Sequence, residues 1–498
     1  MWPFRTNREK TEQSLPRVTR TAPVILRTVP FRRRMLEGRY DVAQTTADNA
    51  RHWAMADGLS ADAATPADVR KKLRDRARYE VANNSYAKGI VLTIANDCIG
   101  TGPRLQLLTA VPEINKQVEA AFAQWSKAID LAGKLRTMRM AKSTDGELFA
   151  VLTGNPLLDS PVKLDVQLIE ADRIASPYST LQAGPSEVDG IFIDAFGNPK
   201  MYCILREHPG DVTSWAKEYD FVDAPAVIHW FRGDRPGQHR GVPEITPALP
   251  LFAQLRRYTL AVLAAAETAA DFAAVLYTDA PANGEAQALE PMDIVELEKR
   301  MATVLPDGWK LGQVEAHQPT TTYSEFKREI LNEIARCLNL PYNIAACNSS
   351  GYNYASGRLD HQTYYKSIRV EQTHLAEVVL DRVFSAWIAE ARLLSEFAYL
   401  RSARTMPTGR QVGLEHQWFF DGTEHVDPQK EANAQETRLK NNTTTLAYEY
   451  ARQGRDWEEA LHQRAKEKQL MKQLGLVEGA VPAQPDEEID ADVAEEAA

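Results

Sequence analysis

The sequence predicts an α+β protein that is predominantly helical, and three observations support this class. Residues 60–240 alternate between helical patterns and short segments with period-2 hydrophobic alternation. From residue 246 onward the pattern changes to long helices, the first of them rich in alanine. A hydrophobic content of 44% in 498 residues is enough for a sizeable core, and this length suggests about three domains.

The first half of the chain begins with two helices and then becomes rich in strands. A Thr-Pro signal at Thr65 starts a helix over 65–84, and a more apolar helix follows over 85–100. A turn and a strand occupy 99–107, and a further helix covers 114–130. The expected strands then lie within four segments, 146–154, 164–174, 190–207 and 226–233.

The second half is expected to be helical around one small insert. The alanine-rich helix begins at Thr246 and extends to residue 275, and a second helix runs from the capping residue Ser324 until it stops before Pro341. Between them lies a mixed insert, 278–318. Next comes a helix of about 35 residues, and two shorter helices, 429–440 and 456–474, come last. The apolar face of the long helix contains Ile368, Leu375, Val379, Val383 and Trp387.

The formal net charge is −10, so the whole molecule is not expected to bind DNA as a sequence-independent polycation. The charge is unevenly distributed, because residues 1–34 carry nine Lys and Arg against two Glu, whereas residues 477–498 carry eight acids and no base. Both ends are expected to be solvated arms. The four cysteines form no CxxC pair, which argues against a zinc site and indicates an intracellular, reducing environment.

The longest apolar run, residues 258–277, is about long enough to span a bilayer. It contains Glu267 and Asp271, and each acid costs about 3 kcal/mol at the centre of a membrane. Alanine, the commonest residue of the run, offsets little of that cost. We therefore expect no membrane span and no membrane partner.

Common catalytic patterns are missing from the sequence. The chain has no Walker A motif, and Gly100-Thr101-Gly102 is followed by Pro103 and a strand-like segment rather than by the helix of a dinucleotide site. Asp145 and Glu147 fall two residues apart on an expected strand, where they could bind a metal or act as an acid–base pair. Solvent-facing carboxylates beside a turn are the commoner explanation for such a pair.

Cys347, Asp360 and His361 offer the parts of a cysteine nucleophile site. Asp360 and His361 are adjacent on one expected helix, so their side chains diverge by roughly 100° and the carboxylate is badly placed to orient the ring. A capping Asp and a surface His explain both residues. We therefore expect no enzyme, no metal and no cofactor, with a cytosolic cysteine hydrolase that uses Cys347 and His361 as the alternative.

Residues 348–357 read NSSGYNYASG, an uncharged stretch between two helical segments. Its glycines supply mobility and its two tyrosines supply bulk without charge. A surface Ω-loop packed on its own stem would explain this composition.

The order of several segments resembles the lambda family of tailed-phage portal proteins over roughly residues 35–475. The segments that carry the resemblance are NNSYAKGIVLTIANDCIGTG, IEADRI, FRGDRPGQHRGVPEITP, NLPYNIAAC with NYASGRLDHQTYY, HQWFFDGTEHVDPQKEANA and ARQGRDWEEALHQRAKE. The N-terminal arm, the acidic tail and the insert at 278–318 match least.

The resemblance implies a portal fold that assembles as a ring, with a wing, a stem, a clip and a crown. Carried over to this chain, it implies a basic N-terminal arm (1–39), a wing (40–245), a stem helix (246–277), a clip (278–318), a second stem helix (319–344), a tunnel loop (345–357), a long helix with the wing return (358–404), a helical crown (405–475) and an acidic tail (476–498).

The resemblance also implies a function, which is a subunit of the ring-shaped DNA channel at one capsid vertex that nucleates head assembly. The implied partners are further copies of the chain, commonly in a dodecamer, double-stranded DNA bound without sequence preference, the terminase large subunit, the major capsid or scaffold protein, and head–tail connector proteins. The implied location is the virion, with assembly in the host cytoplasm.

Two sets of residues would serve this function. The DNA channel would be lined by the tunnel-loop residues Asn348, Ser349, Ser350, Gly351, Tyr352, Asn353, Tyr354, Ala355, Ser356 and Gly357. An uncharged lining would touch DNA without gripping it, whereas a basic residue in every copy would pair with phosphates and make DNA stick, with a strong dependence on salt. The surface Ω-loop is the alternative. The stem contact between subunits would use Ala261, Ala265, Ala269 and Ala273, which make the helix thin enough for a close neighbour. Alanine is also the best helix former, and that property explains the same residues without a contact.

Overall fold

The computed structural model describes residues 50–54, 56–177, 186–211, 218–271, 275–278, 309–312, 322–401, 414–422 and 428–476. The chain divides into two compact units, Met1–Gly58 and Leu59–Ala498. In the first unit, a turn covers residues 50–54. The expected arm at 1–39, most of the expected clip and the tail beyond residue 476 lie outside the described residues.

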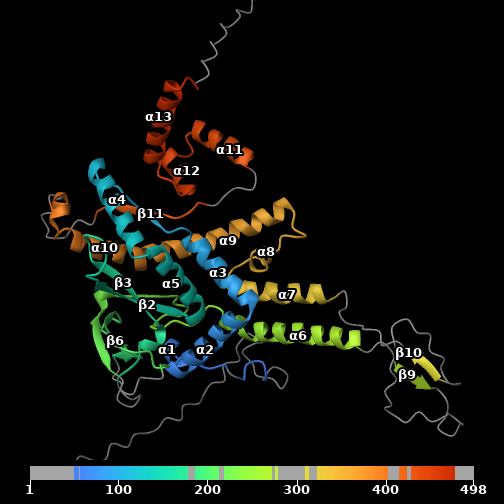
Figure 1. The fold of residues 1–498 in the computed structure, drawn as a ribbon. Helices are drawn as coiled ribbons and strands as arrows, with labels where there is room; N and C mark the ends of the chain where they lie inside the picture. The colour runs from blue at the N-terminus through green and yellow to red at the C-terminus, as the bar shows by residue number, and fades with distance from the viewer. Residues whose placement is uncertain are drawn as a thin grey trace, which may run out of the picture. The chain divides into compact units, whose positions relative to one another are not determined.

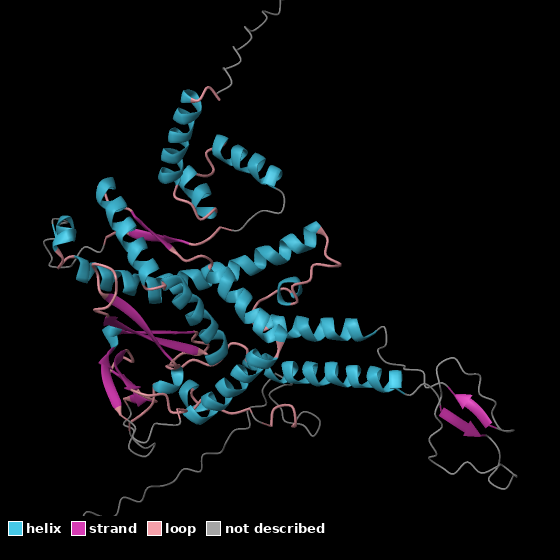
Figure 2. Cartoon of the chain, in the orientation of Figure 1, coloured by secondary structure: helices cyan, strands magenta, loops and turns pink. Residues whose placement is uncertain are grey.

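Helices dominate the described part of the second unit (Figure 2), which confirms the predicted α+β class with a helical majority. The helices are α1 (Ala61–Ala64), α2 (Ala67–Asn83), α3 (Ser85–Ile99), α4 (Pro112–Ala128), α5 (Leu131–Asp145), α6 (Leu249–Asp271), α7 (Thr322–Arg336), α8 (Tyr342–Ala345), α9 (Tyr354–Leu375), α10 (Asp381–Ala391), α11 (Pro428–Lys440), α12 (Leu446–Arg452) and α13 (Trp457–Gln473). None of them is long and apolar enough to cross a membrane.

The strands of the described residues form four small antiparallel sheets. They are β1 (Arg104–Leu107), β2 (Glu147–Gly154), β3 (Leu164–Ile169), β4 (Glu187–Val188), β5 (Ile191–Ile193), β6 (Pro199–Leu205), β7 (Tyr219–Asp223), β8 (Val227–Phe231), β9 (Val275–Thr278), β10 (Trp309–Gly312) and β11 (His416–Phe419). The central sheet has the order β3-β2-β8, and a second sheet has the order β4-β5-β6-β7. In the central sheet Ala150 of β2 lies opposite Leu168 on one side and Ile228 on the other. The two remaining sheets pair β1 with β11 and β9 with β10.

Helix α5 is absent from the sequence-based expectation, which placed strands directly after α4. Its buried face carries polar side chains, including Arg139, Lys142 and Asp145, so the usual apolar repeat of a buried helix is hidden. Gly146 ends the helix with a φ of 89°, and a Cβ there would lie 2.3 Å from the carbonyl carbon of Val242. Only glycine fits that close approach.

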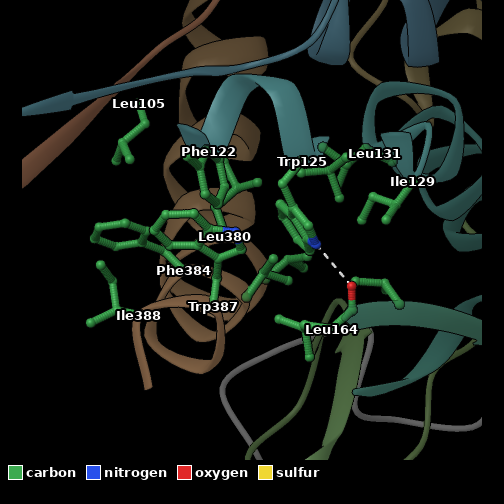
Figure 3. Close-up of a cluster of buried hydrophobic side chains, with 14 of the residues drawn as sticks. Leu105, Phe122, Trp125, Ile129, Leu131, Leu164, Leu380, Phe384, Trp387 and Ile388 are labelled. Carbon is green, nitrogen blue, oxygen red and sulfur yellow. Dashed lines mark hydrogen bonds between the residues drawn. The ribbon is translucent and has the colours of Figure 1, made fainter. Parts of the chain in front are cut away.

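The largest hydrophobic cluster joins α4 and α10 to the central sheet (Figure 3). Trp125 is buried on α4, and its indole N–H donates to the carbonyl oxygen of Leu164 at 2.8 Å. Phe122 meets the rings of Phe384 and Trp387 edge-on, with centroids 5.6 and 5.5 Å apart. Such pairs contribute about 0.5–1.5 kcal/mol beyond the area that they bury.

The expected long helix is confirmed as one continuous run from Tyr354 to Ala391, in which a π-helical segment (Ala376–Leu380) joins α9 to α10. Its predicted apolar residues are all buried. Leu375, Val379 and Val383 recur every four residues, a spacing that drifts around an ordinary α-helix of 3.6 residues per turn. The wider π turn holds more residues, so it keeps these side chains on one face.

Candidate functional site

Helices α6 and α7 run side by side (Figure 1) and pack through aromatic rings. Tyr258 of α6 stacks on Tyr323 of α7 at 5.7 Å between centroids, and it meets Phe326 edge-on at 4.8 Å. A 3-10 turn (Thr246–Ala248) precedes α6 and coincides with the predicted start of this helix. Helix α7 begins at Thr322, so Ser324 lies inside the helix and is not the predicted cap.

The predicted contact residues of α6 have different surroundings. Ala261 is exposed and Ala265 is half-buried. Ala269 belongs to α6 but its side chain is outside the described part, and Ala273 is outside the described residues altogether. Leu260 and Leu263 are 60% and 54% exposed. In the single subunit this helix therefore presents an apolar face to solvent.

The loop between α8 and α9 is shorter than predicted. It covers residues 346–353, and the last four predicted loop residues, Tyr354 to Gly357, form the first turn of α9 instead. The Asn353 side chain caps this helix by accepting a hydrogen bond from the Ser356 N–H at 2.8 Å. Gly351 has a φ of 85° with open space around it, and this conformation favours glycine.

Tyr352 is half-buried within the loop. Burial raises the pKa of its phenol, and the negative charge of Asp360 raises it further. Partial burial of this side chain does not separate a channel lining from the Ω-loop alternative, so the channel-lining role of the loop stays a prediction.

The two ends of the loop are joined by a hydrogen bond between Asn343 and His361. The Asn343 side-chain oxygen accepts from the Ile344 N–H at 3.0 Å, which leaves its amide group to face the Nε2 atom of His361, also at 3.0 Å. Because the amide donates, this imidazole nitrogen is the acceptor. The bond fixes α8 against α9 on either side of the loop.

The parts of the alternative cysteine hydrolase do not come together. Cys347 is exposed with a φ of 50°. Among the described residues, no hydrogen bond joins its thiol to His361, whose Nε2 faces Asn343 instead. Asp360 lies in the second turn of α9, so it is not the capping residue that the sequence suggested.

Asp145 and Glu147 are also placed differently from the prediction. Asp145 ends α5 and Glu147 begins β2, so they do not share a strand. Both are buried, at 9% and 0% exposure, and so they are not solvent-facing carboxylates. Asp145 pairs with Arg78 at 2.7 Å, and Glu147 pairs with Arg240 at 2.7 Å. Burial raises the pKa of Glu147, but Arg240 and His229 outweigh burial and hold that pKa well below its usual value.

Sequence reasoning missed this buried ion-pair network. Its signal is a row of arginines four residues apart on α2, Arg70, Arg74 and Arg78, which lie on one helix face. Arg74 pairs with Asp172 at 3.0 Å, and Arg78 pairs with the second carboxylate oxygen of Asp172 at 2.8 Å. A row of this kind on an otherwise polar helix indicates acidic partners elsewhere in the fold.

One group of three potential metal ligands gathers among the described residues, Glu170, Asp172 and His208. Both carboxylate oxygens of Asp172 already face the guanidinium groups of Arg74 and Arg78. Those positive charges oppose a bound cation. The group therefore fits an ion-pair cluster rather than a metal site.

Comparisons with known proteins identify relatives over most of the chain. The sequence matches the model of the lambda family of phage portal proteins over residues 47–372. A "probable portal protein" of Halomonas phage phiHAP-1 is 25% identical over 457 residues, which cover 84% of this chain and 86% of the relative. Portal protein B of Escherichia phage lambda is 21% identical over 459 residues, which cover 80% of this chain and 84% of the relative.

Two solved structures align with most of this chain. A chain from the neck of an empty gene transfer agent particle has a TM-score of 0.47 at 13% identity, and the alignment covers 79% of this chain and 94% of that one. A chain from the neck of the native particle has a TM-score of 0.45 at 14% identity, with coverages of 80% and 95%. Likeness at these TM-scores is too loose to indicate an assembly. The sequence match over 47–372 spans more than half of the chain, and the chain therefore belongs to the lambda family of phage portal proteins, which are structural rather than catalytic components of the virion.

Proposed function

We propose that this chain is the ring-forming subunit of the DNA channel at one capsid vertex. The observation that carries the proposal is the family match, which extends from the residues before α1 into α9. The ring nucleates head assembly in the host cytoplasm and remains in the virion. It binds the terminase large subunit during packaging and the head–tail connector proteins afterwards, and the major capsid or scaffold protein surrounds it.

The domain division proposed for the ring follows the sequence-based assignment. Residues 40–245 are the wing, supported by the buried cluster around β2. Residues 246–277 and 319–344 are the stem, supported by the long pair α6 and α7. Strand β9 includes the last three residues predicted for the first stem helix, which is therefore shorter than predicted, and its partner β10 lies within the clip, 278–318. The described helices of the crown, 405–475, are α11 to α13.

Imaging of the purified protein tests the ring. We expect closed rings, commonly of twelve copies, by negative-stain electron microscopy, with a matching mass by light scattering. Identical subunits close a ring when one surface contacts a different surface of the next copy. A monomer at micromolar concentration, under all salt conditions, would contradict the proposal.

The stem contact is tested by Ala261→Arg, with Ala389→Arg as the matched control. Ala261 lies in the exposed apolar face of α6, whereas Ala389 is exposed on α10, outside the stem. We expect Ala261→Arg to remove rings, because a long charged side chain would separate α6 from the stem helix of the neighbouring copy. The circular dichroism of the monomer should stay unchanged. Rings that survive Ala261→Arg and are lost in the control would place the contact elsewhere.

The tunnel loop is tested by replacing Tyr352 and Tyr354 together. We expect the double Ala variant to form normal rings and procapsids but to package or retain less DNA, because the channel loses bulk. The double Lys variant should have a packaging defect that eases as salt rises, because phosphate contacts are screened over a Debye length of about 8 Å at physiological ionic strength and less above it. If both variants package like the parent, the Ω-loop alternative holds.

A further inference from the structure

Strand β7 is an edge of the four-stranded sheet β4-β5-β6-β7. The backbone N–H of Arg206, just after β6, donates to the carbonyl oxygen of Glu218, just before β7, at 3.0 Å. In an antiparallel pair, residues alternate between those that bond the neighbouring strand and those whose backbone groups point away from it. The N–H and C=O groups of Tyr219 and Phe221 therefore point away from β6, and among the described residues no strand pairs with them.

This sheet is strongly acidic. Its described residues, 186–211 and 218–223, contain eight Asp and Glu against two Lys and Arg. Arg206 already pairs with two acids of the same sheet, and Arg173, which donates to the carbonyl groups at the end of β6, adds one base beside it. Three exposed acids have no Lys or Arg partner in the described part of the chain, namely Glu207, Asp211 and Asp223. The edge therefore suits a positively charged partner.

The same sheet also exposes aromatic side chains. Phe221 of β7 is 51% exposed, and its ring lies 6.0 Å from that of Phe192 on β5. Phe196, in the turn between β5 and β6, is 90% exposed. An open edge strand with exposed aromatic rings is a site where another strand readily adds. The partner that fits is an extended segment with both apolar and basic residues.

The N-terminal arm contains a segment of this composition. Residues 24–29 read VILRTV, between Pro23 and Pro30, and residues 31–34 read FRRR. β-branched residues favour strands, and proline is compatible with the ends of an edge strand. Six residues also match the length of β7, which has five. With nine Lys and Arg against two Glu in residues 1–34, the arm carries the charge that the sheet lacks.

The arm is also long enough to reach an adjacent copy. Residues 30–49 separate the VILRTV segment from the first described turn, and they would span at most about 70 Å when fully extended. This length is about three times the radius of gyration, roughly 22 Å, of a compact unit with the size of Leu59–Ala498. In a ring, where adjacent copies touch, the neighbour's sheet therefore lies within reach.

We propose that residues 24–29 of one copy bind the outer edge of β7 in the neighbouring copy as a fifth strand of its acidic sheet. The backbone groups of Tyr219 and Phe221 then gain partners, and the arginines at 32–34 face the acids of the sheet. In strand addition of this kind, main-chain hydrogen bonds supply affinity. The contact rests on the ring proposed above, and it joins two different surfaces, so it propagates around that ring. DNA is a poorer occupant of this edge, because its phosphates would meet the acids.

Cross-linking tests the contact in assembled rings. Chains with Thr28→Cys and chains with Asp223→Cys are co-expressed, both in a Cys347→Ser background that removes the exposed native thiol. A short bismaleimide should then give an interchain dimer in the ring fraction, and each variant alone should give none. The matched control replaces Asp223→Cys by Leu157→Cys, which is 92% exposed but outside the acidic sheet, and it should not cross-link to residue 28.

Proline substitution tests whether the two backbones pair. Ile25→Pro and Leu26→Pro are made separately in the chain that carries Thr28→Cys. Adjacent residues of a strand point their N–H groups to opposite sides, so only one of the two prolines removes a hydrogen bond to β7. That variant should lower the cross-link yield at least fivefold and the other less than twofold, while Ile25→Val and Leu26→Val keep the parental yield. Equal yields in the two proline variants would overturn the strand pairing.

Charge reversal tests why this edge selects the arm. Arg32→Glu with Arg33→Glu should lower the yield at least threefold, and raised salt should lower it in the parent, because salt screens the attraction between exposed charges. An unchanged yield in the reversed variant would overturn the role of charge. A cross-link that forms only when both cysteines are in one chain would overturn docking on the neighbour. Normal rings without any cross-link between positions 28 and 223 would overturn the contact and leave the portal assignment intact, whereas absence of rings in the parent would overturn the ring itself.

Discussion

The wing core and the crown helices of this chain are stabilised in different ways. The wing core, defined here as the buried cluster around β2, contains the fully buried rings of Trp125, Trp230 and Trp387. In the crown helices α11, α12 and α13, Glu449 is the only buried position among the residues whose burial is described, and Gly454 is buried in the turn between α12 and α13. The comparison indicates that the wing has a hydrophobic core of its own, whereas the described crown helices bury few side chains within their own chain.

Charge pairs show the same difference between the two regions. In the wing the Arg240–Glu147 pair is almost completely buried, with side-chain exposures of 1% and 0%. In the crown the Arg464–Glu467 pair is exposed, at 61% and 44%. Breaking a buried pair leaves an uncompensated charge in the interior, while an exposed pair contributes little because water solvates both partners. Three substitutions test this contrast, beginning with the largest expected effect.

Arg240→Ala should destabilise the wing by about 3–5 kcal/mol. The guanidinium group of Arg240 contacts Glu147 and also donates to the Asp189 carboxylate at 2.9 Å, so its removal leaves Glu147 buried without its main partner. Urea unfolding followed by tryptophan fluorescence measures the change. Arg235→Ala is the control, since Arg235 is exposed and, among the described residues, its side chain donates to the Leu59 carbonyl, and we expect about 0.5 kcal/mol or less there. Equal effects of the two variants would mean that the buried Arg240–Glu147 pair stabilises the wing no more than an exposed arginine does.

Glu244 should make the stability of the wing depend on pH in the acidic range. Burial raises the pKa of Glu244, but the charges of Arg139, Lys142 and Arg232 outweigh burial and lower the pKa to about 2. An unfolded glutamate titrates near pH 4.3. As the pH falls from about 4.3 to about 2, the unfolded chain takes up a proton that the folded chain does not, so stability is present above this window and is lost within it.

Glu244→Gln isolates that contribution. The variant should be less stable than the parent at pH 7, and the difference between the two should narrow by about 2 kcal/mol between pH 7 and pH 3, because only the parent loses the Glu244 contribution. Denaturant unfolding at both pH values provides the measurement. A difference that stays constant with pH would mean that Glu244 has the same pKa in the folded and unfolded chains.

The sequence predicted the long elements well because their apolar periodicity is strong. The repeat of Leu375, Val379 and Val383 predicted the long helix, and the alternation in β2 predicted a strand. Helix α5 could not be found in the same way, because its buried positions include Arg139 and Lys142, whose partners come from distant segments. Burial of charged groups depends on tertiary pairing, which a local pattern does not contain.

The loop between α8 and α9 was predictable in position but not in its boundaries. The uncharged composition of 348–357 marked the loop, yet the capping interaction of Asn353 with Ser356 starts α9 inside it. The Asn343–His361 bond could not be predicted, since it joins two elements whose relative placement follows from the whole fold. Likewise, the alanine-rich sequence of α6 predicts a helix, but it does not indicate which face of that helix is exposed to solvent in the single subunit.

The smallest expected effect is that of Arg464→Ala in the crown. Arg464 and Glu467 form an exposed pair three residues apart on α13, at 3.1 Å, and a pair of this kind contributes little because water solvates both partners. In the unassembled chain the variant should therefore leave helix content by circular dichroism almost unchanged. Loss of most of the helical signal of α13 in the monomer would show that a surface ion pair supports the crown, and the contrast with the wing core would no longer hold.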